Sequence, residues 1–346
     1  MVDWRNKYSK IPPKICFDDL VGCTYCKTIF SACVPDEHLD AIFTVDTSHN
    51  FLLCGKAGNG KRTLARAFGR EMVDNGYSYV RMRADHLIGE SDSETCENIK
   101  SFFNDVLEAS VSESAKGCYI FLEDISNMVS SKLVCAALDR KLEMIANDSK
   151  TKTIVVATAE DLAEIPSALK RTMTVCMAEL PDEDDREDYL KSRLDKNIYI
   201  ERSVSYQQMS EITEGFNFDM LNKLVTAVFM LAKQFIVANA QEEGVSVGEY
   251  LNTASFMLNK RMFEDIVDSV KVEDKPVPAA GVDVSALLQN LTVQNIAPVA
   301  QPGVASVESV VKSEPAVKEE KTAETDGPQG DFMDRFMFYK GQGLDL

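Results

Sequence analysis

The sequence predicts an α/β fold in which a parallel sheet has helices on both faces and is followed by a small helical lid and a disordered C-terminal tail. Three observations lead to this prediction. Short apolar runs alternate with helix-length amphipathic segments in the first half of the chain, helix follows helix in the next part, and the last part has no sustained period. Strand–helix alternation is typical of parallel sheets that are buried on both faces.

Four apolar runs predict the buried strands, because each is rich in β-branched or aromatic residues and most precede a helical pattern. They are FLLC at 51–54, YSYVRM at 77–82, CYIFL at 118–122 and TIVVAT at 153–158. After Pro181 the pattern becomes wholly helical. We therefore divide the chain into an N-terminal lead-in (1–14), an α/β core (15–181), a helical lid (182–272) and a disordered tail (273–346).

The tail is rich in Pro, Ala, Val, Ser, Glu and Lys and lacks the apolar residues that would offset the entropy of ordering it. Residues 331–340 are an exception. Phe332, Met333, Phe336 and Met337 would share one face if this segment became helical, as the anchors of a groove-binding helix do. We expect a motif there that docks a protein partner or substrate.

The composition narrows the function classes. With 55 acidic and 37 basic residues the formal net charge is −18, which disfavours nonspecific binding to nucleic acid. The start of the chain has no apolar core of the kind that a secretory signal needs, and no apolar run approaches the roughly 20 residues of a membrane span. Nine cysteines lie among apolar residues, so we expect a cytoplasmic protein with free thiols and no membrane partner.

Four of these cysteines have a spacing that also suits structural zinc. They are Cys16, Cys23, Cys26 and Cys33, in the pattern C-x₆-C-x₂-C-x₆-C. Because a free cysteine commonly behaves as a small buried hydrophobe, we favour a role in packing over a metal site.

The sharpest motif is a glycine-rich loop that fits G-x-x-x-x-G-K between the run FLLC and the helical segment RTLARAFGREM. Its glycines let successive backbone N–H groups converge on phosphate oxygens, and the helix that follows directs its N-terminal dipole at the same anion. The alternative is a glycine-rich turn with an incidental lysine. We predict a nucleotide-binding site made of Gly55, Lys56, Ala57, Gly58, Asn59, Gly60, Lys61, Arg62 and Thr63.

The residue after Lys61 departs from this motif. A Ser or Thr hydroxyl normally ligates Mg²⁺ at this position, but here Arg62 occupies it and Thr63 follows. Adjacent helical residues point in different directions, so Thr63 does not substitute without a local shift. We expect magnesium to be held more weakly or through water.

Two carboxylates end the third apolar run. Glu123 and Asp124 follow CYIFL, where a carboxylate beside a phosphate loop would hold Mg²⁺ and its neighbour would orient or deprotonate the attacking water. The alternative is an ordinary acidic strand end. The phosphate loop upstream favours the functional interpretation.

Taken in order, several segments resemble the AAA+ ATPases, and specifically their AAA branch. Besides the phosphate loop and the acidic pair, they are CFDDLVGC (16–23), ADHLIGESDSETCENIKSFFNDV (84–106), TIVVATAEDLAEIPSALKR (153–171), ITEGFNFDMLNKLVTAVFMLA (212–232) and MFEDIVDSVK (262–271). The resemblance covers about residues 14–271.

The resemblance implies ATP and Mg²⁺ as cofactors and assigns roles to particular residues. Glu123 would take the place of the magnesium ligand, directly or through water, and Asp124 that of the catalytic glutamate. Thr158 would be the sensor residue near the γ-phosphate. Arg171 would be the arginine finger that reaches into the next subunit, and Leu87 with Ile88 would fall at the pore loop.

The activity that the resemblance implies is ATP hydrolysis that remodels or disassembles a protein complex, in a homo-oligomeric ring that is most often a hexamer. Two alternatives stay open. The departures at Arg62, Glu123 and Asp124 favour a nucleotide-dependent scaffold, or pseudo-ATPase, with little turnover. A DNA-associated AAA+ loader is the other alternative, and the net charge of −18 argues against it.

Overall fold

The computed structural model describes residues 7–34, 50–147, 152–195, 198–202, 204–253 and 256–273. Of the predicted tail (273–346), all but its first residue lies outside these ranges. The docking motif expected at 331–340 therefore also lies outside the described residues.

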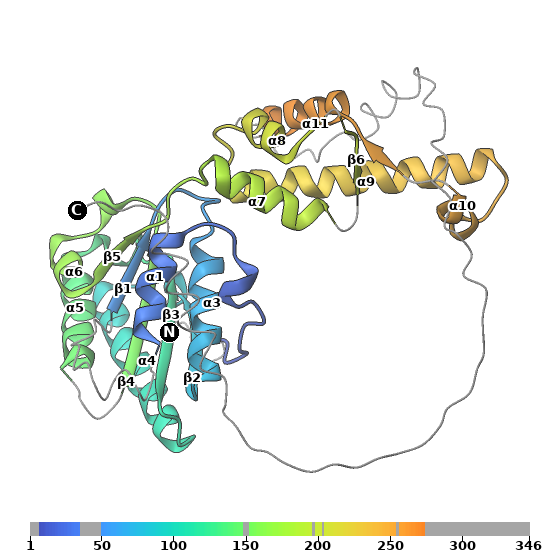
Figure 1. The fold of residues 1–346 in the computed structure, drawn as a ribbon. Helices are drawn as coiled ribbons and strands as arrows, with labels where there is room; N and C mark the ends of the chain where they lie inside the picture. The colour runs from blue at the N-terminus through green and yellow to red at the C-terminus, as the bar shows by residue number, and fades with distance from the viewer. Residues whose placement is uncertain are drawn as a thin grey trace, which may run out of the picture. The chain divides into compact units, whose positions relative to one another are not determined.

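A five-stranded parallel sheet forms the core, with the strand order β2-β3-β4-β1-β5 (Figure 1). This confirms the predicted fold class, and the four apolar runs are the first four strands. The fifth strand was not predicted from the sequence. The strands are β1 (Asn50–Cys54), β2 (Tyr77–Arg83), β3 (Gly117–Glu123), β4 (Lys152–Ala159) and β5 (Thr174–Met177).

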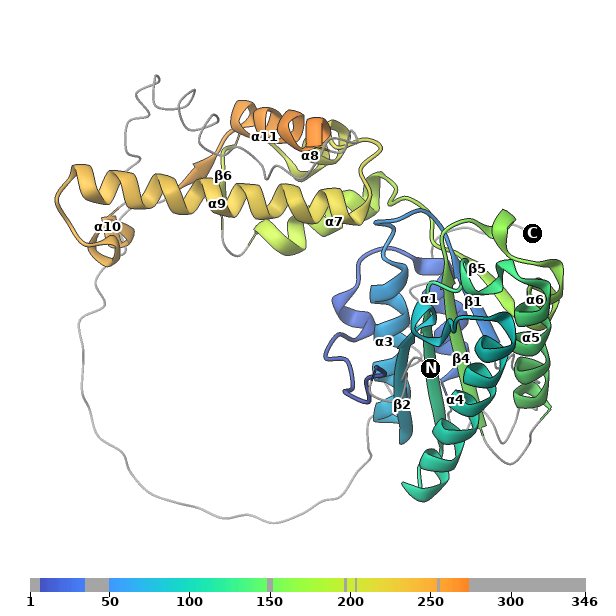
Figure 2. The same cartoon turned by 180° about the vertical axis from the view of Figure 1, so that it is seen from behind.

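Helices cover both faces of this sheet, as the two opposite views show (Figures 1 and 2). One face packs against α1 (Thr24–Cys33) and α3 (Lys61–Asp74), and the other against α4 (Asp92–Ser112), α5 (Lys132–Ala146) and α6 (Ser167–Thr172). Alternate residues of β3 supply the two apolar cores, because successive side chains of a strand point to opposite faces. Tyr119 and Phe121 belong to the core under α3, and Ile120 and Leu122 to the core under α4.

The carboxyl ends of the inner strands meet at one edge of the sheet. Leu53 of β1 pairs with Thr158 of β4, and Leu122 of β3 pairs with Ala157 of β4. Ligands of open α/β sheets bind outside this edge. Short 3₁₀ turns lie between the longer elements: η1 (Phe17–Asp19), η2 (Ala84–Leu87), η3 (Met128–Ser130) and η4 (Leu162–Glu164).

The segment after residue 181 is mainly helical, as predicted, and has an apolar core of its own. Side chains at the N-terminal caps fix where three of its helices begin: Asp182, Ser205 and Asn217 each accept a hydrogen bond from a backbone N–H in the first turn. The same segment also contains a short two-stranded parallel sheet, which the sequence did not predict. The elements are α7 (Glu183–Leu194), β6 (Tyr199–Ile200), α8 (Tyr206–Ile212), α9 (Phe218–Glu242), α10 (Val247–Thr253), β7 (Met257–Leu258) and α11 (Lys260–Glu273).

Helix α9 is the one helix in the described part of the chain that is long and apolar enough to cross a membrane, and 44 % of its 18-residue window is buried. The core helix of a lid passes the same test of length and composition. Leu221, Leu224, Val228 and Leu231 of α9 lie in the apolar core of the lid together with residues of α11. Packing within the lid therefore explains the apolar character of α9.

Candidate functional site

The loop between β1 and α3 has a backbone that glycine makes possible. Gly55, Gly58 and Gly60 have φ angles of 147°, 84° and 79°, a region that L-residues with side chains rarely adopt. A Cβ on Gly55 would lie 2.2 Å from the carbonyl oxygen of Ala178. That carbonyl cannot easily move away, because the N–H of Ala178 donates to Cys54 O at 2.7 Å.

Helix α3 begins without a side-chain cap. Gly60 is its N-cap residue, and the first bond of the helix runs from the N–H of Leu64 to Gly60 O at 2.9 Å. The N–H groups of residues 61–63 precede this bond, so they are the donors that an α-helix leaves unsatisfied at its N-terminus. Such an end, following a glycine-rich loop, is a binding site for phosphate.

The Lys61 ammonium group lies inside this loop. It donates to the carbonyl oxygens of Gly55 and Lys56, the second at 2.8 Å. Burial lowers the pKa of Lys61, and the nearby carboxylates of Glu160 and Asp124 oppose that effect. The lysine is therefore held where it would meet an anion bound by the loop.

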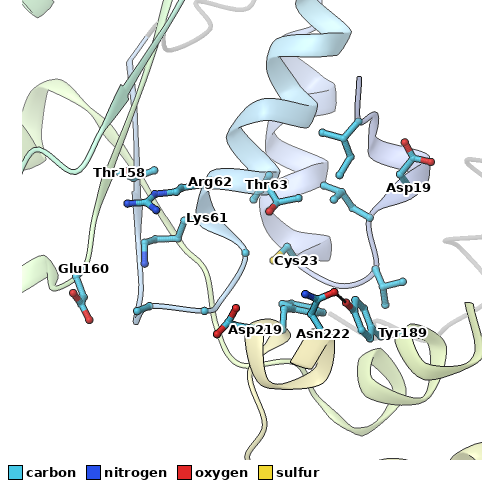
Figure 3. A pocket seen from close by; sticks show the side chains of 18 of the residues that line it. Asp19, Cys23, Lys61, Arg62, Thr63, Thr158, Glu160, Tyr189, Asp219 and Asn222 are labelled. Carbon is cyan, nitrogen blue, oxygen red and sulfur yellow. Dashed lines mark hydrogen bonds between the residues drawn. The ribbon is translucent and has the colours of Figure 1, made fainter. Parts of the chain in front are cut away.

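A cavity of about 550 Å³ opens beside the loop (Figure 3). Its volume is within the usual range for small-molecule and cofactor sites. Its walls come from the loop, from the segment around η1, from the ends of β3 and β4, and from α7 and α9. Lys61, Arg62, Asp124 and Thr158 are among the residues that line it.

The lid contacts the loop directly. The N–H of Asp219, at the start of α9, donates to Gly58 O at 3.3 Å. The Asn217 side chain donates from Nδ2 to Ala57 O, also at 3.3 Å. A ligand on the loop would therefore lie against elements of both the core and the lid.

Asp124 and Thr158, two of the predicted catalytic residues, lie together on the cavity wall. The N–H of Asp124 donates to Thr158 Oγ1 at 2.9 Å, and the N–H of Ile125 donates to Thr158 O at the same distance. Asp124 has a φ of 57°, which turns the chain sharply at the end of β3. The structure thus brings Lys61, Asp124 and Thr158 to one cavity, and their individual roles stay predictions.

A family model, described as ATPase family associated with various cellular activities (AAA), matches residues 51–202. The match runs from β1, through the phosphate loop and the whole sheet, to β6. Residues 51–202 are therefore an AAA domain of the kind found in AAA+ ATPases. The chain is an ATP-binding protein, and the glycine-rich loop is the phosphate loop of its AAA domain. No curated protein matches the chain.

Glu123 takes no part in the wall of the AAA-domain cavity. Its side chain is only 2 % exposed, and its Oε1 accepts a hydrogen bond from Arg81 Nε at 2.7 Å. Arg81 lies on β2, diagonal to Glu123 on the same face of the sheet. The ion pair would have to open before Glu123 could reach a ligand in the cavity.

Arg81 is a residue that the sequence-based reasoning missed. Its backbone is held by two hydrogen bonds to one residue, because Arg81 N donates to Ser9 O and Ser9 N donates to Arg81 O, each at 2.9 Å. The hydrogen bond with Glu123 raises the pKa of the Arg81 guanidinium above its ordinary value. The available signal was a lone arginine inside the otherwise apolar strand YSYVRM.

The side chains at this edge do not fit a magnesium ion, which prefers near-octahedral oxygen ligands. Arg62 stands in place of the usual hydroxyl, and Thr63 extends to the other side of the start of α3, toward Asp19 (Figure 3). Glu123 is already paired with a cation.

Two further predicted residues lie away from the cavity. Arg171 is exposed in the last turn of α6 and is not part of the wall. Leu87, expected at a pore loop, is fully buried, so that expectation is wrong. The reason is local: η2 turns Leu87 into the core against α4, and Asn98 Nδ2 donates to Leu87 O at 3.1 Å. Ile88 is half-buried against the same core.

The four N-terminal cysteines have free thiols and separate surroundings. Cys26 is buried and its Sγ lies 3.3 Å from Met177 O. Cys16 contacts Asp19, and Cys23 lies on the wall of the cavity, where burial raises the pKa of its thiol to about 11. Cys26 belongs to the apolar core under α3, and Cys23 and Cys33 pack against that core, as the packing interpretation predicts for these three.

Proposed function

We propose that this AAA+ protein works mainly through ATP binding, with slow hydrolysis, and that the bound nucleotide orders a protein assembly. The observation that carries the proposal is the ion pair between Glu123 and Arg81, which occupies the carboxylate expected to serve the metal. This favours the scaffold alternative that the sequence left open.

The parts that bind ATP are complete, whereas those for its hydrolysis are altered. The loop, the α3 N-terminus and Lys61 form a phosphate site by their backbone and one ammonium group. On the hydrolytic side, Asp124 is one methylene shorter than the glutamate usual in this family. A displacement of about 1 Å can reduce a rate on the order of 10²-fold. Binding should therefore persist where turnover is slow.

Binding would act on the lid, because the cavity has walls from the core and from α7 and α9. A ligand that touches both shifts the protein toward the arrangement in which both contacts are made. We propose that this arrangement favours a homo-oligomeric ring, most often a hexamer in this family, with Arg171 of each subunit reaching the site of its neighbour. Protein partners would join through residues 331–340.

A second candidate function is ATP-driven remodelling or disassembly of a protein complex. It is favoured by Asp124 and Thr158, which lie on the same cavity wall as Lys61 and are joined by a hydrogen bond of 2.9 Å. In that case Asp124 would activate the attacking water despite its shorter side chain.

Equilibrium ATP binding and steady-state hydrolysis by the full chain test the proposal. We expect ATP to bind and turnover to stay below about 0.01 s⁻¹, some 10²-fold under the low end of common kcat values. Lys61→Ala should weaken ATP binding about 100-fold, roughly 2.7 kcal/mol. Lys132→Ala is the matched control, since this exposed lysine lies in the first turn of α5 and does not line the cavity.

Asp124→Asn separates the two candidate functions. Turnover near 1 s⁻¹ that disappears in Asp124→Asn would overturn slow hydrolysis and favour the remodelling ATPase instead, given that typical kcat values begin at about 1 s⁻¹. Failure of the wild-type chain to bind ATP under any condition would exclude both.

A further inference from the structure

We infer that this AAA domain binds ATP without a divalent cation, and that Arg62 supplies at the phosphates the positive charge that Mg²⁺ would otherwise bring. The inference rests on the proposed function, because it assumes that ATP occupies the cavity. It starts from the misfit between the side chains present and a magnesium site.

Arg62 lies where it could contact the phosphates. It lies in the first turn of α3 and lines the cavity, directly after the lysine of the phosphate loop. Its side chain extends to the side of Thr158, as does Lys61 (Figure 3). A guanidinium cannot ligate a cation, but it presents several N–H donors in a fork that matches phosphate oxygens.

The Arg62 guanidinium is also available. It is exposed, and within the described ranges no side chain or carbonyl forms a hydrogen bond or ion pair with it. Burial is the main cause of the lowered pKa of the neighbouring Lys61, and the charge of Arg62 adds to it. Two cations held close together at the edge of a cavity are stabilised when an anion binds between them.

Glu123 does not require a metal to compensate its charge. A buried carboxylate is costly unless a cation compensates it. Arg81 compensates Glu123 at 2.7 Å and is itself fixed by its two backbone bonds to Ser9. The charge of Glu123 is therefore compensated by the chain alone.

The negative charge around the cavity explains why Arg62 would be needed. Acidic side chains also line the cavity, among them Asp124, Glu160 and Asp219. Asp219 is paired with Lys223 at 3.0 Å, but Glu160 and Asp124 lie near Lys61 and share its charge. ATP without a metal carries more negative charge than its magnesium complex, so loss of Arg62 should make binding depend on the metal.

The experiment measures the affinity of the full chain for ATP by calorimetry, once with Mg²⁺ and once with EDTA. For the wild-type chain we expect the two affinities to agree within about threefold. Arg62→Ser, which restores the hydroxyl usual at this position, should bind at least tenfold more weakly in EDTA, about 1.4 kcal/mol. Added Mg²⁺ should recover most of that loss.

Two further variants make the test specific. Arg62→Lys keeps a positive charge and should retain most of the binding in EDTA. Arg66→Ser removes an exposed arginine one turn further along α3 that does not line the cavity, and it should behave like the wild-type chain in both buffers.

The outcomes separate this inference from the function on which it rests. Wild-type affinity that falls tenfold or more in EDTA would overturn the inference and leave ATP binding intact. Equal affinities for Arg62→Ser and the wild-type chain in EDTA would overturn the role of Arg62. Absence of ATP binding in both buffers would remove the proposed function and the inference together.

Discussion

The phosphate loop and the carboxyl end of β3 lie at the same edge of the sheet, yet they differ in how closely they follow the AAA pattern. The loop keeps its glycines, its lysine and the open N-terminus of α3. At the end of β3, Glu123 precedes Asp124 and is paired with Arg81. Backbone groups therefore carry the phosphate binding, whereas metal binding and water activation depend on side chains.

Phosphate binding here depends mainly on backbone N–H groups, which many sequences can supply as long as the glycines remain. Metal binding and water activation depend on particular side chains placed to within about 1 Å, so one altered residue is enough to disable them. A protein can therefore keep phosphate binding and lose metal binding and water activation. Three predictions test this contrast, from the largest expected effect to the smallest.

The largest effect is expected in the loop, where Gly55→Ala would place a methyl group 2.2 Å from Ala178 O. We expect it to lower the free energy of unfolding by at least about 3 kcal/mol, since steric strain at a special backbone conformation belongs to the severe class of substitutions. Urea unfolding followed by circular dichroism measures it. ATP binding should be lost as well.

Gly60→Ala is the matched variant for Gly55→Ala. Gly60 also has a positive φ, but its nearest atom would be a ring carbon of Phe218 at 3.5 Å, an ordinary contact. Only the cost of the left-handed conformation remains, about 1–2 kcal/mol. Equal losses for the two variants would show that crowding by Ala178 does not shape the loop.

A smaller effect is expected at β3, where Arg81→Met would leave Glu123 buried without its cation. Removing one partner of a buried pair commonly costs about 3–5 kcal/mol. Since Arg81 is 39 % exposed, we expect about 2 kcal/mol in the free energy of unfolding. The double variant Arg81→Met with Glu123→Gln should recover more than half of that loss.

A second ion pair, between Arg83 of β2 and Asp85 of η2, provides the control. Arg83 and Asp85 are also 2.7 Å apart, but their side chains are 57 % and 46 % exposed. Exposed pairs contribute little, so Arg83→Met should cost less than about 0.5 kcal/mol. Similar losses for Arg81→Met and Arg83→Met would mean that Glu123 does not depend on Arg81, which would reopen its role as a metal ligand.

The sequence predicted the parts of the fold that have a strong local signal. Strands β1, β3 and β4 are buried on nearly every residue, so they read as continuous apolar runs. Strand β2 is buried on four of its seven residues, and these include its aromatic and aliphatic side chains. Strand β5 was missed because it has four residues of which only Cys176 is buried. Strands β6 and β7 have two residues each, too few for any periodicity.

The same limit applies to the site. The phosphate loop is a contiguous motif, so its residues could be read directly from the sequence. The ion pair of Arg81 with Glu123 depends on β2 lying beside β3. The spacing of motifs along the sequence does not predict the order of the strands in the sheet. Leu87 was placed at a pore loop by resemblance, whereas the turn of η2 buries it.

The smallest effect is expected where the lid meets the loop, at Asn217. This side chain makes two bonds: Oδ1 accepts from Met220 N at 2.9 Å and caps α9, while Nδ2 donates to Ala57 O at 3.3 Å. Asn217→Ala removes both and should cost about 1 kcal/mol, the usual price of a lost cap. Asn217→Ser keeps a capping oxygen but is too short to reach Ala57, so stability should change by less than about 0.5 kcal/mol.

ATP affinity distinguishes the two bonds of Asn217. If the lid stabilises the bound loop, Asn217→Ser should weaken ATP binding about threefold, roughly 0.6 kcal/mol, although it leaves the cap in place. Ser205→Ala, which removes the cap of α8 away from the loop, should lower stability and leave ATP affinity unchanged. Wild-type affinity in Asn217→Ser would show that the loop binds ATP on its own, so that the contrast between loop and strand end would not extend to the lid.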